Sequence, residues 1–316
     1  MNPSILLPQI NTYLEHIVPE WPKSLYDPVR MALTTGGKRI RPLLAALCAG
    51  DAASEDNWLP AACAVELLHT FTLVHDDIMD NAATRRGKPT IHIAFGLNEA
   101  ILSGDVIVAL ATEALSLAPR SVEMLGEFSS GFKAVCEGQA LDEEYEERDE
   151  VSLAEYFTMI ELKTARLFEV AAVLGVVAGG GAHREACRVF AREIGLAFQL
   201  QDDRLDLIGN ESFGKTIGGD ILESKRSALF ALAMQQYAEV DGKERALLDR
   251  LRGRCTEPTD VQLAREVFAK LGVMEETKRL AAEHTALAEQ ALLALPDARQ
   301  REDLLDYARH LLGRSV

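Results

Sequence analysis

The sequence predicts an all-α protein, a single-domain bundle of ten or more helices spanning residues 1–316. Alanine and leucine are abundant while valine and isoleucine form only short runs, and this composition favours helices over strands. Apolar residues recur at helical spacing through most of the chain. No linker and no fixed-period repeat interrupts them, so neither a second domain nor a solenoid is expected.

The expected helices follow one another between glycine and proline breaks. Ser152 is a candidate N-cap with Glu155 as its capping-box partner. The acidic run 142–150 reads as a solvated helix end or loop, and 51–60 reads as a polar loop. The expected ranges are 5–17, 29–33 after Pro28, 43–49, a long helix from Ala61, 98–118, 122–142, 152–177, 189–207, 228–237, 260–270, 274–295 and 301–312.

Composition narrows the classes of function. The net charge of −16 argues against nucleic acid and against an anionic membrane surface as partners. The longest apolar run, 170–182, is too short and too rich in glycine for a membrane span. The five cysteines include no C-x-x-C pair and read as buried reduced thiols, and the N-terminus lacks a basic signal-peptide region. We therefore expect a cytoplasmic protein.

The end of the long helix that begins at Ala61 carries clustered carboxylates. Asp76 and Asp80, four residues apart, share a helix face, while Asp77 points aside. Two carboxylates aimed at one point repel each other unless a cation lies between them, and Mg²⁺ prefers such oxygen ligands together with phosphate oxygens. Arg85 and Arg86 follow closely, and arginine binds diphosphate well. Alone, this pattern is more often a solvated helix end; together with a second copy it predicts a metal–diphosphate site.

That second copy is FQLQDDRLD, in which Asp202, Asp203 and Asp206 repeat the spacing after another apolar segment. A core helix bearing three carboxylates is costly unless metal offsets the burial. The stretch GGKRIRP, residues 36–42, places three cations in four residues of an acidic chain and indicates a further anion pocket. The glycine-bearing loop 209–219 holds Lys215, with Lys225 beyond it, and is typical of a lid over phosphate.

The sequence resembles the trans-prenyl diphosphate synthases of the polyprenyl synthetase family. The resemblance rests on five stretches in family order: GGKRIRP, the stretch 66–90, GQALD (138–142), LKTARLF (162–168) and FQLQDDRLDLIGNESFGKTIGGD. The resemblance covers nearly the whole chain, and the ordered set is highly specific. It implies an all-α bundle around a deep central cavity, usually a homodimer. It also implies Mg²⁺-dependent condensation of isopentenyl diphosphate onto an allylic diphosphate, with three Mg²⁺ ions per site.

The resemblance assigns roles by motif position. Asp76, Asp80 and Asp202 would hold Mg²⁺, with Asp206 and Asp77 completing the network through water. Thr164 and Gln199 would place dipoles near the allylic carbocation. The expected ligands of the allylic diphosphate are Arg85, Lys163, Gln199, Lys215 and Lys225. Those of isopentenyl diphosphate are Lys38, Arg41, His69 and Arg86, with His69 seven residues before Asp76 on nearly the same helix face.

Chain length depends in this family on a bulky residue five positions before the first aspartate, which acts as the floor of the cavity. Here it is Phe71, and no insertion separates the aspartates, so C15–C20 products are expected, with geranylgeranyl diphosphate favoured. At about 100° per residue, however, Phe71 lies about 140° around the helix from Asp76. Thr72 lies directly below Asp76, and if Thr72 lines the cavity the product is longer.

Three alternatives remain open. A class I terpene cyclase shares the first motif, but its second metal motif usually mixes Asn, Ser or Thr and Glu, and it has no use for a second diphosphate pocket. A non-catalytic synthase subunit tends to lose one aspartate cluster, and both are intact here. A purely structural bundle leaves the matched motifs unexplained.

Overall fold

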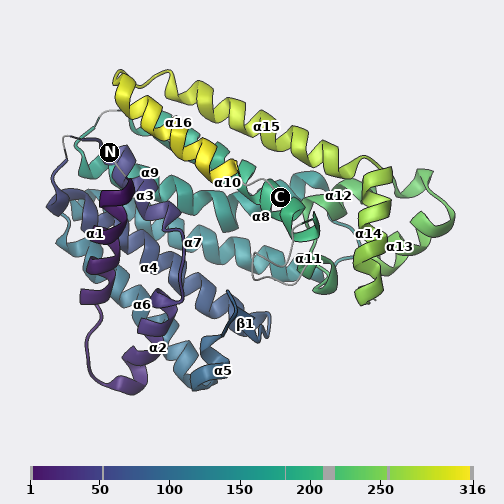
Figure 1. Ribbon diagram of the computed structural model, residues 1–316, viewed down its shortest axis with the longest axis horizontal. Helices are drawn as coiled ribbons and strands as arrows, with labels where there is room; N and C mark the ends of the chain where they lie inside the picture. Colours follow the sequence, from purple (N-terminus) through teal and green to yellow (C-terminus); the bar gives the residue numbers. More distant parts are fainter. Residues whose placement is uncertain (1–2, 52, 182, 209–217, 255–256, 314–316) are drawn as a thin grey trace. The chain divides into compact units, whose positions relative to one another are not determined.

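The computed structural model describes residues 3–51, 53–181, 183–208, 218–254 and 257–313 (Figure 1). Regular structure in these residues is almost entirely helical, which confirms the all-α prediction. The exception is an unpredicted antiparallel hairpin in which β1 (Thr84–Arg85) pairs with β2 (Lys88–Pro89). The chain forms two compact units, each assembled from three segments that alternate along the sequence. Because the segments of the two units alternate along the chain, neither unit is a continuous stretch of sequence, and a single domain stays our proposal.

The first unit contains residues 1–132, 167–189 and 291–307. Its complete elements are α1 (Pro3–His16), α2 (Lys23–Thr34), α3 (Ile40–Ala49), α4 (Glu55–Met79), the hairpin, α5 (Ile91–Phe95) and α6 (Leu97–Leu117). It also takes α7 (Ser121–Glu146) up to Phe132, α9 (Arg166–Ala178) from Leu167, α10 (Arg184–Ile208) up to Val189 and α16 (Ala298–Leu312) up to Tyr307. The central helix is α4, which is buried on all sides from Trp58 to Leu68.

Close approaches between helices hold this unit together. A Cβ atom added at Gly175 would lie 2.1 Å from the carbonyl oxygen of Ala45, so α9 packs directly on the backbone of α3. A Cβ at Gly131 would lie 2.2 Å from Val170, as expected for a small residue at a packing position. Gly126, for which we expected the same role, has no atom within 4 Å of its added Cβ among the described residues.

Two prolines that we expected at helix boundaries lie inside helices instead. Pro28 and Pro60 each stand at the sixth position, of α2 and α4 respectively. Proline removes the N–H that would bond to the carbonyl four residues earlier. Those carbonyls belong to Ser24 and Asp56, which are exposed residues of the first turns, so water can satisfy them. The polar loop expected at 51–60 is therefore wrong from Glu55 onward, where α4 has already begun.

The second unit contains residues 133–166, 190–290 and 308–316. Its elements are the remainder of α7 and α10, α8 (Leu153–Ile160), the π-helical turn η1 (Glu161–Ala165), α11 (Gly219–Leu222), α12 (Ala228–Gln235), the 3₁₀ turn η3 (Tyr237–Glu239), α13 (Gly242–Arg252), α14 (Pro258–Lys270), α15 (Val273–Leu292) up to Gln290 and the end of α16 from Ala308. The capping box of Ser152 and Glu155 is present at the start of α8 and confirms that prediction. The sequence predicts neither α11, nor α13, nor the π-helical turn.

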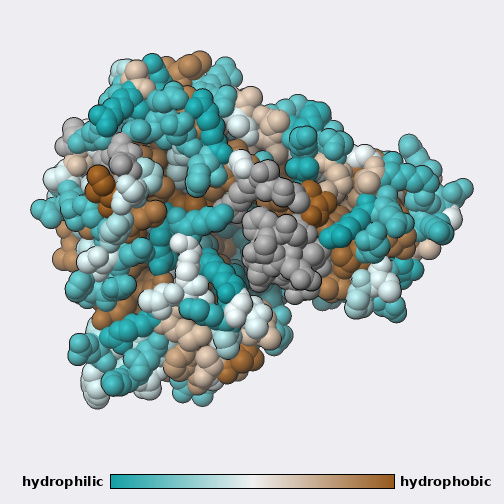
Figure 2. Space-filling view, in the orientation of Figure 1, coloured by the Kyte–Doolittle hydropathy of each residue, from teal (hydrophilic) through white to brown (hydrophobic). Residues whose placement is uncertain are grey.

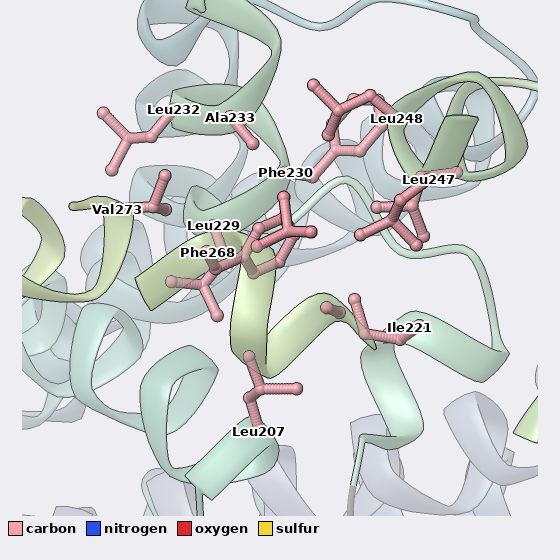
Figure 3. Packing of buried hydrophobic residues seen from close by; sticks show 13 residues of the cluster. Leu207, Ile221, Leu229, Phe230, Leu232, Ala233, Leu247, Leu248, Phe268 and Val273 are labelled. Carbon is pink, nitrogen blue, oxygen red and sulfur yellow. The ribbon is translucent and has the colours of Figure 1, made fainter. Parts of the chain in front are cut away.

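The apolar core of this unit forms among α10 to α15. Figure 3 shows Leu207, Ile221, Phe230, Leu247 and Phe268 directed toward one another from different helices. Leu207 lies in the last turn of α10. This packing therefore anchors the end of the helix that carries the second aspartate motif.

Two features bear on the expectations about membranes and cysteines. By length and composition α6 could cross a membrane, and 44% of its apolar window is buried in the structure; a single helix of this kind does not by itself indicate a membrane span. Cys48, Cys63 and Cys187 are buried thiols, as expected, whereas Cys136 is exposed. Cys255 lies outside the described residues.

Candidate active site

The first aspartate motif lies at the carboxyl end of α4. Asp80 caps the helix and donates its backbone N–H to the carbonyl of Asp76 at 2.8 Å. Asp77 is buried, and Arg85 Nε donates to its Oδ1 at 2.8 Å. Burial raises the pKa of Asp77, although the Arg85 charge acts in the opposite direction. Arg85, a predicted diphosphate ligand, thus also fixes the middle carboxylate of the motif.

The second motif occupies the last turns of α10. Asp202 and Asp206 are partly buried, and Asp206 Oδ2 accepts the backbone N–H of Asp220 at 3.1 Å. Asp203 is buried, and burial raises its pKa to about 6. Its carboxylate accepts hydrogen bonds from Tyr156 Oη at 2.7 Å, Gln199 Nε2 at 2.9 Å and the backbone N–H of Ala228 at 2.8 Å. In each motif the second aspartate therefore accepts hydrogen bonds from other groups of the protein.

Both helix ends suit a divalent cation. Neither α4 nor α10 has a basic residue in its last turn as described, and carboxylates occupy those turns instead. The helix dipole places negative partial charge there, so carboxylates are unfavourable unless a cation offsets them. Asp76 and Asp80 in one unit, and Asp202 and Asp206 in the other, supply the oxygen donors that Mg²⁺ takes. The donor set of each motif therefore fits the metal that the sequence predicts.

A basic cluster forms in the first unit around the turn Gly36–Lys38. A guanidinium nitrogen of Arg86 donates to the carbonyl of Gly36, which joins the hairpin to this turn. Gly36, Gly37 and Arg86 all have positive φ, at 94°, 150° and 53°. Lys38 is exposed at the end of the turn. The structure thus brings the GGKRIRP stretch and Arg86 together, as the predicted isopentenyl diphosphate pocket requires.

Arg41 and His69 complete this cluster. Arg41 is 6% exposed, lies over the ring of Phe168 at 4.7 Å, and its Nε has no hydrogen-bond partner among the described residues. Burial lowers the pKa of Arg41 to about 10. Burial and the charges of Arg41, Arg86, Arg85 and Arg39 lower the pKa of His69 well below its ordinary value. His69 is therefore a neutral imidazole beside several cations.

Arg39 has a different role from its neighbours. It pairs with Glu66 of α4, with Nη1 at 2.8 Å from Oε1, and also donates to Asn11 Oδ1 at 3.0 Å and to the carbonyl of Leu33 at 2.5 Å. Its φ of 49° places it in the left-handed region at the start of α3. We did not foresee this pair, because the sequence shows only three adjacent cations and a glutamate 27 residues away.

Two predicted diphosphate-binding lysines of the second unit share one carboxylate. Lys163 Nζ lies 2.6 Å from Asp142 Oδ2, and Lys225 Nζ lies 3.4 Å from the same oxygen and 2.5 Å from Glu146 Oε1. Although burial acts to raise it, the pKa of Asp142 is lowered because of these two ammonium groups. Asp142, the last residue of the GQALD stretch, therefore joins the candidate site. Lys215, the third predicted lysine, lies outside the described residues.

The π-helical turn η1 presents Lys163 and Thr164. Thr164 Oγ1 donates to Gln199 Oε1 at 2.8 Å, which joins two of the residues expected near the carbocation. Gly138 of α7 allows this arrangement, because a Cβ there would lie 2.3 Å from the backbone nitrogen of Lys163. Single π-helical turns are frequent at functional sites because they widen the helix locally. No sequence signal that we recognised predicts this turn.

Phe71, the predicted cavity floor, is partly buried in the middle of α4. Its ring packs edge-on against Phe132 of α7 with centroids 5.4 Å apart, and against His75 at 4.6 Å. The hydroxyl of Thr72 donates to the carbonyl of His69 at 2.8 Å. Both residues keep some accessible surface, so their relative roles in chain length stay a prediction.

The comparisons with known proteins decide the family. The chain matches the polyprenyl synthetase family over residues 22–271. It belongs to that family. A polyprenyl synthetase of this type is a prenyl diphosphate synthase, a trans-prenyltransferase of a family that depends on divalent metal.

Individual relatives of this polyprenyl synthetase cover nearly all of its length. It is 39% identical over 306 residues to a short chain isoprenyl diphosphate synthase from Methanothermobacter thermautotrophicus, covering 93% of this chain and 91% of that one. It is 33% identical over 325 residues to a geranylfarnesyl diphosphate synthase from Natronomonas pharaonis, covering 95% and 93%. A polyprenyl synthase from Caulobacter crescentus CB15, solved in complex with calcium and isoprenyl diphosphate, is 32% identical with a TM-score of 0.90, covering 99% and 96%.

Proposed function

We propose that this polyprenyl synthetase condenses isopentenyl diphosphate with an allylic diphosphate, head to tail and in trans, to a product of C15–C20. Geranylgeranyl diphosphate, the C20 product, is the favoured one. The likeness to a short chain isoprenyl diphosphate synthase supports this range. Mg²⁺ is the proposed metal because the donor set consists of carboxylates. The resemblance implies three ions per site.

The two diphosphates are assigned to different groups of cations. Lys38, Arg41, His69 and Arg86, which cluster in the first unit, hold isopentenyl diphosphate. The unpaired Nε of Arg41 supports this, because a buried guanidinium N–H without a partner in the described structure suits an anion. The allylic diphosphate is assigned to Arg85, Lys163, Gln199, Lys215 and Lys225.

The proposed mechanism separates a negative and a positive charge, and the residues of the site stabilise both. The bond between C1 of the allylic group and oxygen breaks, and its electron pair leaves with diphosphate. Arginine and lysine groups stabilise that anion as it forms, and bound Mg²⁺ adds to the same stabilisation. Thr164 and Gln199 direct dipoles toward the carbocation. The double bond of isopentenyl diphosphate attacks it, a carbon–carbon bond forms, and the proton lost from the adduct passes to the departing diphosphate.

The aromatic side chain of Phe71 is the observation that carries the proposed chain length. It lies one helical turn and a residue before Asp76, and its contact with Phe132 makes it part of a double aromatic layer. Such a layer stops a growing chain more firmly than a single flexible side chain because two packed rings must move together. We therefore expect Phe71→Ala to remove one of the two packed rings and to let the chain grow longer.

The test is product analysis of the purified protein and its Phe71→Ala variant. Each is incubated with Mg²⁺, isopentenyl diphosphate and the C10 or C15 allylic diphosphate, and products are separated by chain length. Wild type is expected to stop at C15–C20 and the variant to continue beyond it. A wild-type product of mainly C30 or longer would refute the short-chain proposal, and an unchanged product in the variant would remove Phe71 from the account.

A second candidate is a somewhat longer product. The likeness to a geranylfarnesyl diphosphate synthase, whose product is C25, favours it. Thr72 supplies the physical route, since it projects on the Asp76 side of α4 and is too small to close a cavity. The same product analysis on Thr72→Phe distinguishes the cases, because only a chain that passes Thr72 is shortened by that change.

We also propose a homodimer that associates through α5 and α6. Large apolar side chains are exposed along this segment: Ile93 (57%), Phe95 (39%), Leu97 (54%), Ile101 (41%) and Leu102 (56%). Hydrophobic surface is visible over α5 (Figure 2). Large apolar side chains that are exposed together on one segment often mark a protein interface. Light scattering should give twice the mass of one chain for the wild type and the mass of one chain for Leu102→Lys. A monomeric wild type would refute the proposal.

A cytoplasmic location is a further proposal, supported by the reduced thiols of Cys48, Cys63 and Cys187. Cell fractionation followed by immunodetection tests it. Recovery with the membrane or secreted fraction would contradict it.

A further inference from the structure

A chain of side-chain hydrogen bonds runs through the second unit. Tyr156 Oη of α8 donates to Asp203 Oδ2 at 2.7 Å, and the backbone N–H of Ala228, at the start of α12, donates to the same oxygen at 2.8 Å. Gln199 Nε2 donates to the other oxygen, Oδ1, at 2.9 Å. Gln199 Oε1 then accepts from Thr164 Oγ1 at 2.8 Å. Asp203, Tyr156 and Thr164 are buried, so water does not readily replace these bonds.

The direction of this chain is set at Asp203. A carboxylate only accepts hydrogen bonds, so Gln199 must turn its NH₂ group toward Asp203 and its carbonyl oxygen toward Thr164. That carbonyl oxygen accepts, and Thr164 has one hydrogen to give. The hydroxyl hydrogen of Thr164 is therefore committed to Gln199, and lone pairs of its oxygen are what the hydroxyl can offer to any further group.

Two independent anchors keep Asp203 itself in place. Tyr156 and Ala228 both donate to Oδ2, and this leaves Oδ1 as the oxygen that faces Gln199. The anchors come from different helices, α8 and α12, so rotation of the carboxylate would break bonds to both. Asp203 lies between Asp202 and Asp206 in sequence, yet its carboxylate accepts hydrogen bonds from three donors of the protein.

We propose that Asp203 is a positioning residue that sets the polarity of the Thr164–Gln199 pair, so that Thr164 presents lone pairs, and not its hydrogen, to the allylic carbocation. This rests on the proposed function, which places Thr164 beside that cation. Lone pairs attract the developing positive charge, whereas a hydroxyl hydrogen directed into the site would oppose it. The second aspartate of this motif thereby acts on the carbon skeleton of the substrate through two other residues.

The variant that tests the polarity is Asp203→Asn. Its amide oxygen can replace Oδ2 opposite Tyr156 and Ala228, and its NH₂ group then faces Gln199. Gln199 must turn its carbonyl toward this new donor, so its own NH₂ faces Thr164 and the Thr164 hydrogen is released. We expect the single-turnover rate of condensation to fall by about 10²-fold. The KM for isopentenyl diphosphate should be unchanged, because none of the residues assigned to that substrate is altered.

Two companion variants separate positioning from structural support. Tyr156→Phe removes one anchor but keeps the carboxylate and the Ala228 bond, so the polarity persists and the single-turnover rate should stay close to wild type. Thr164→Val removes the hydroxyl and should lower the rate. Adding Asp203→Asn to Thr164→Val should lower the rate by much less than Asp203→Asn lowers it in the wild type, because the hydroxyl whose direction Asp203 sets is gone. Near-ultraviolet circular dichroism and thermal unfolding check that each variant is folded.

The outcomes are distinct. Non-additive loss in the double variant, with the KM for isopentenyl diphosphate unchanged, supports the positioning role. Additive losses, a full rate in Thr164→Val, or a loss in Tyr156→Phe as large as that in Asp203→Asn would overturn it. If wild type itself forms no condensation product, the proposed function fails, and the polarity proposal fails with it.

Discussion

Loss of the Arg39 side chain should have two separate effects: it should lower the stability of the fold, and it should weaken substrate binding. The Arg39–Glu66 pair is nearly buried, with side chains 10% and 5% exposed and 2.8 Å between Nη1 and Oε1. Arg39→Met keeps much of the volume but leaves the Glu66 carboxylate without its ion-pair partner. Breaking a buried pair from one side costs about 3–5 kcal/mol, since an uncompensated charge remains. We therefore expect a loss of about that size in the free energy of unfolding.

The same change should weaken isopentenyl diphosphate binding selectively. Arg39 fixes the turn that carries Lys38 through its bonds to Asn11 and to the carbonyl of Leu33. Without these bonds the turn is held mainly by Arg86, so the KM for isopentenyl diphosphate rises while that for the allylic diphosphate stays near its original value.

The assay uses urea unfolding and steady-state kinetics on three variants: Arg39→Met, Glu66→Leu and the double variant. In the double variant no charge is left unpaired, so it should be more stable than Arg39→Met alone. Its KM for isopentenyl diphosphate should nevertheless stay raised, because Arg39 is still absent. A double variant that is destabilised by the sum of the single losses would refute the reasoning, as would a loss below about 1 kcal/mol in Arg39→Met.

Three further predictions concern single contacts. Lys163→Ala and Lys225→Ala each leave Asp142 one ammonium partner, so their double variant should lose about 1–3 kcal/mol more stability in urea unfolding than the singles combined; simple additivity would contradict this. Folding lowers the pKa of His69, so between that pKa and its ordinary value near 6.5 the unfolded chain binds the extra proton and stability falls as the pH falls. His69→Gln should remove up to about 1.4 kcal/mol per pH unit from that slope in denaturation measured from pH 7.5 to 5, and an unchanged slope would count against it. Gly138→Ala should lower turnover by about 10²-fold, because its Cβ would displace the backbone of Lys163, whereas Gly126→Ala on the same helix should leave turnover unchanged; equal effects would rule out this contact as the cause.

Local chemistry made much of the fold readable from the sequence. Ser152 and Glu155 satisfy each other across one helical turn, so their spacing alone predicts where α8 begins. Glycines 179–181 end α9 as expected, since the chain bends there without steric cost. The prolines were less informative. Pro28 and Pro60 lie inside helices because the carbonyls they leave unpaired are exposed, and exposure is a tertiary property.

The candidate site was predictable where one motif carries the chemistry and unpredictable where distant residues meet. The aspartate spacing predicts which carboxylates share a helix face, because that depends only on helix geometry. The hydrogen bonds that Asp77 accepts from Arg85 and Asp203 accepts from Tyr156 join residues up to 47 positions apart in the chain, so the sequence does not predict them. The role of Arg39 differs from that of its basic neighbours for the same reason, because only a residue distant in sequence, Glu66, pairs with it.

The condensation reaction itself tests the central claim most directly. Purified protein is incubated with isopentenyl diphosphate and each of the C5, C10 and C15 allylic diphosphates, with Mg²⁺ and with EDTA in its place. We expect elongated prenyl diphosphates with at least one starter, formed only with the metal and ending at C15–C20. The absence of any condensation product from a folded protein supplied with Mg²⁺ would contradict the account.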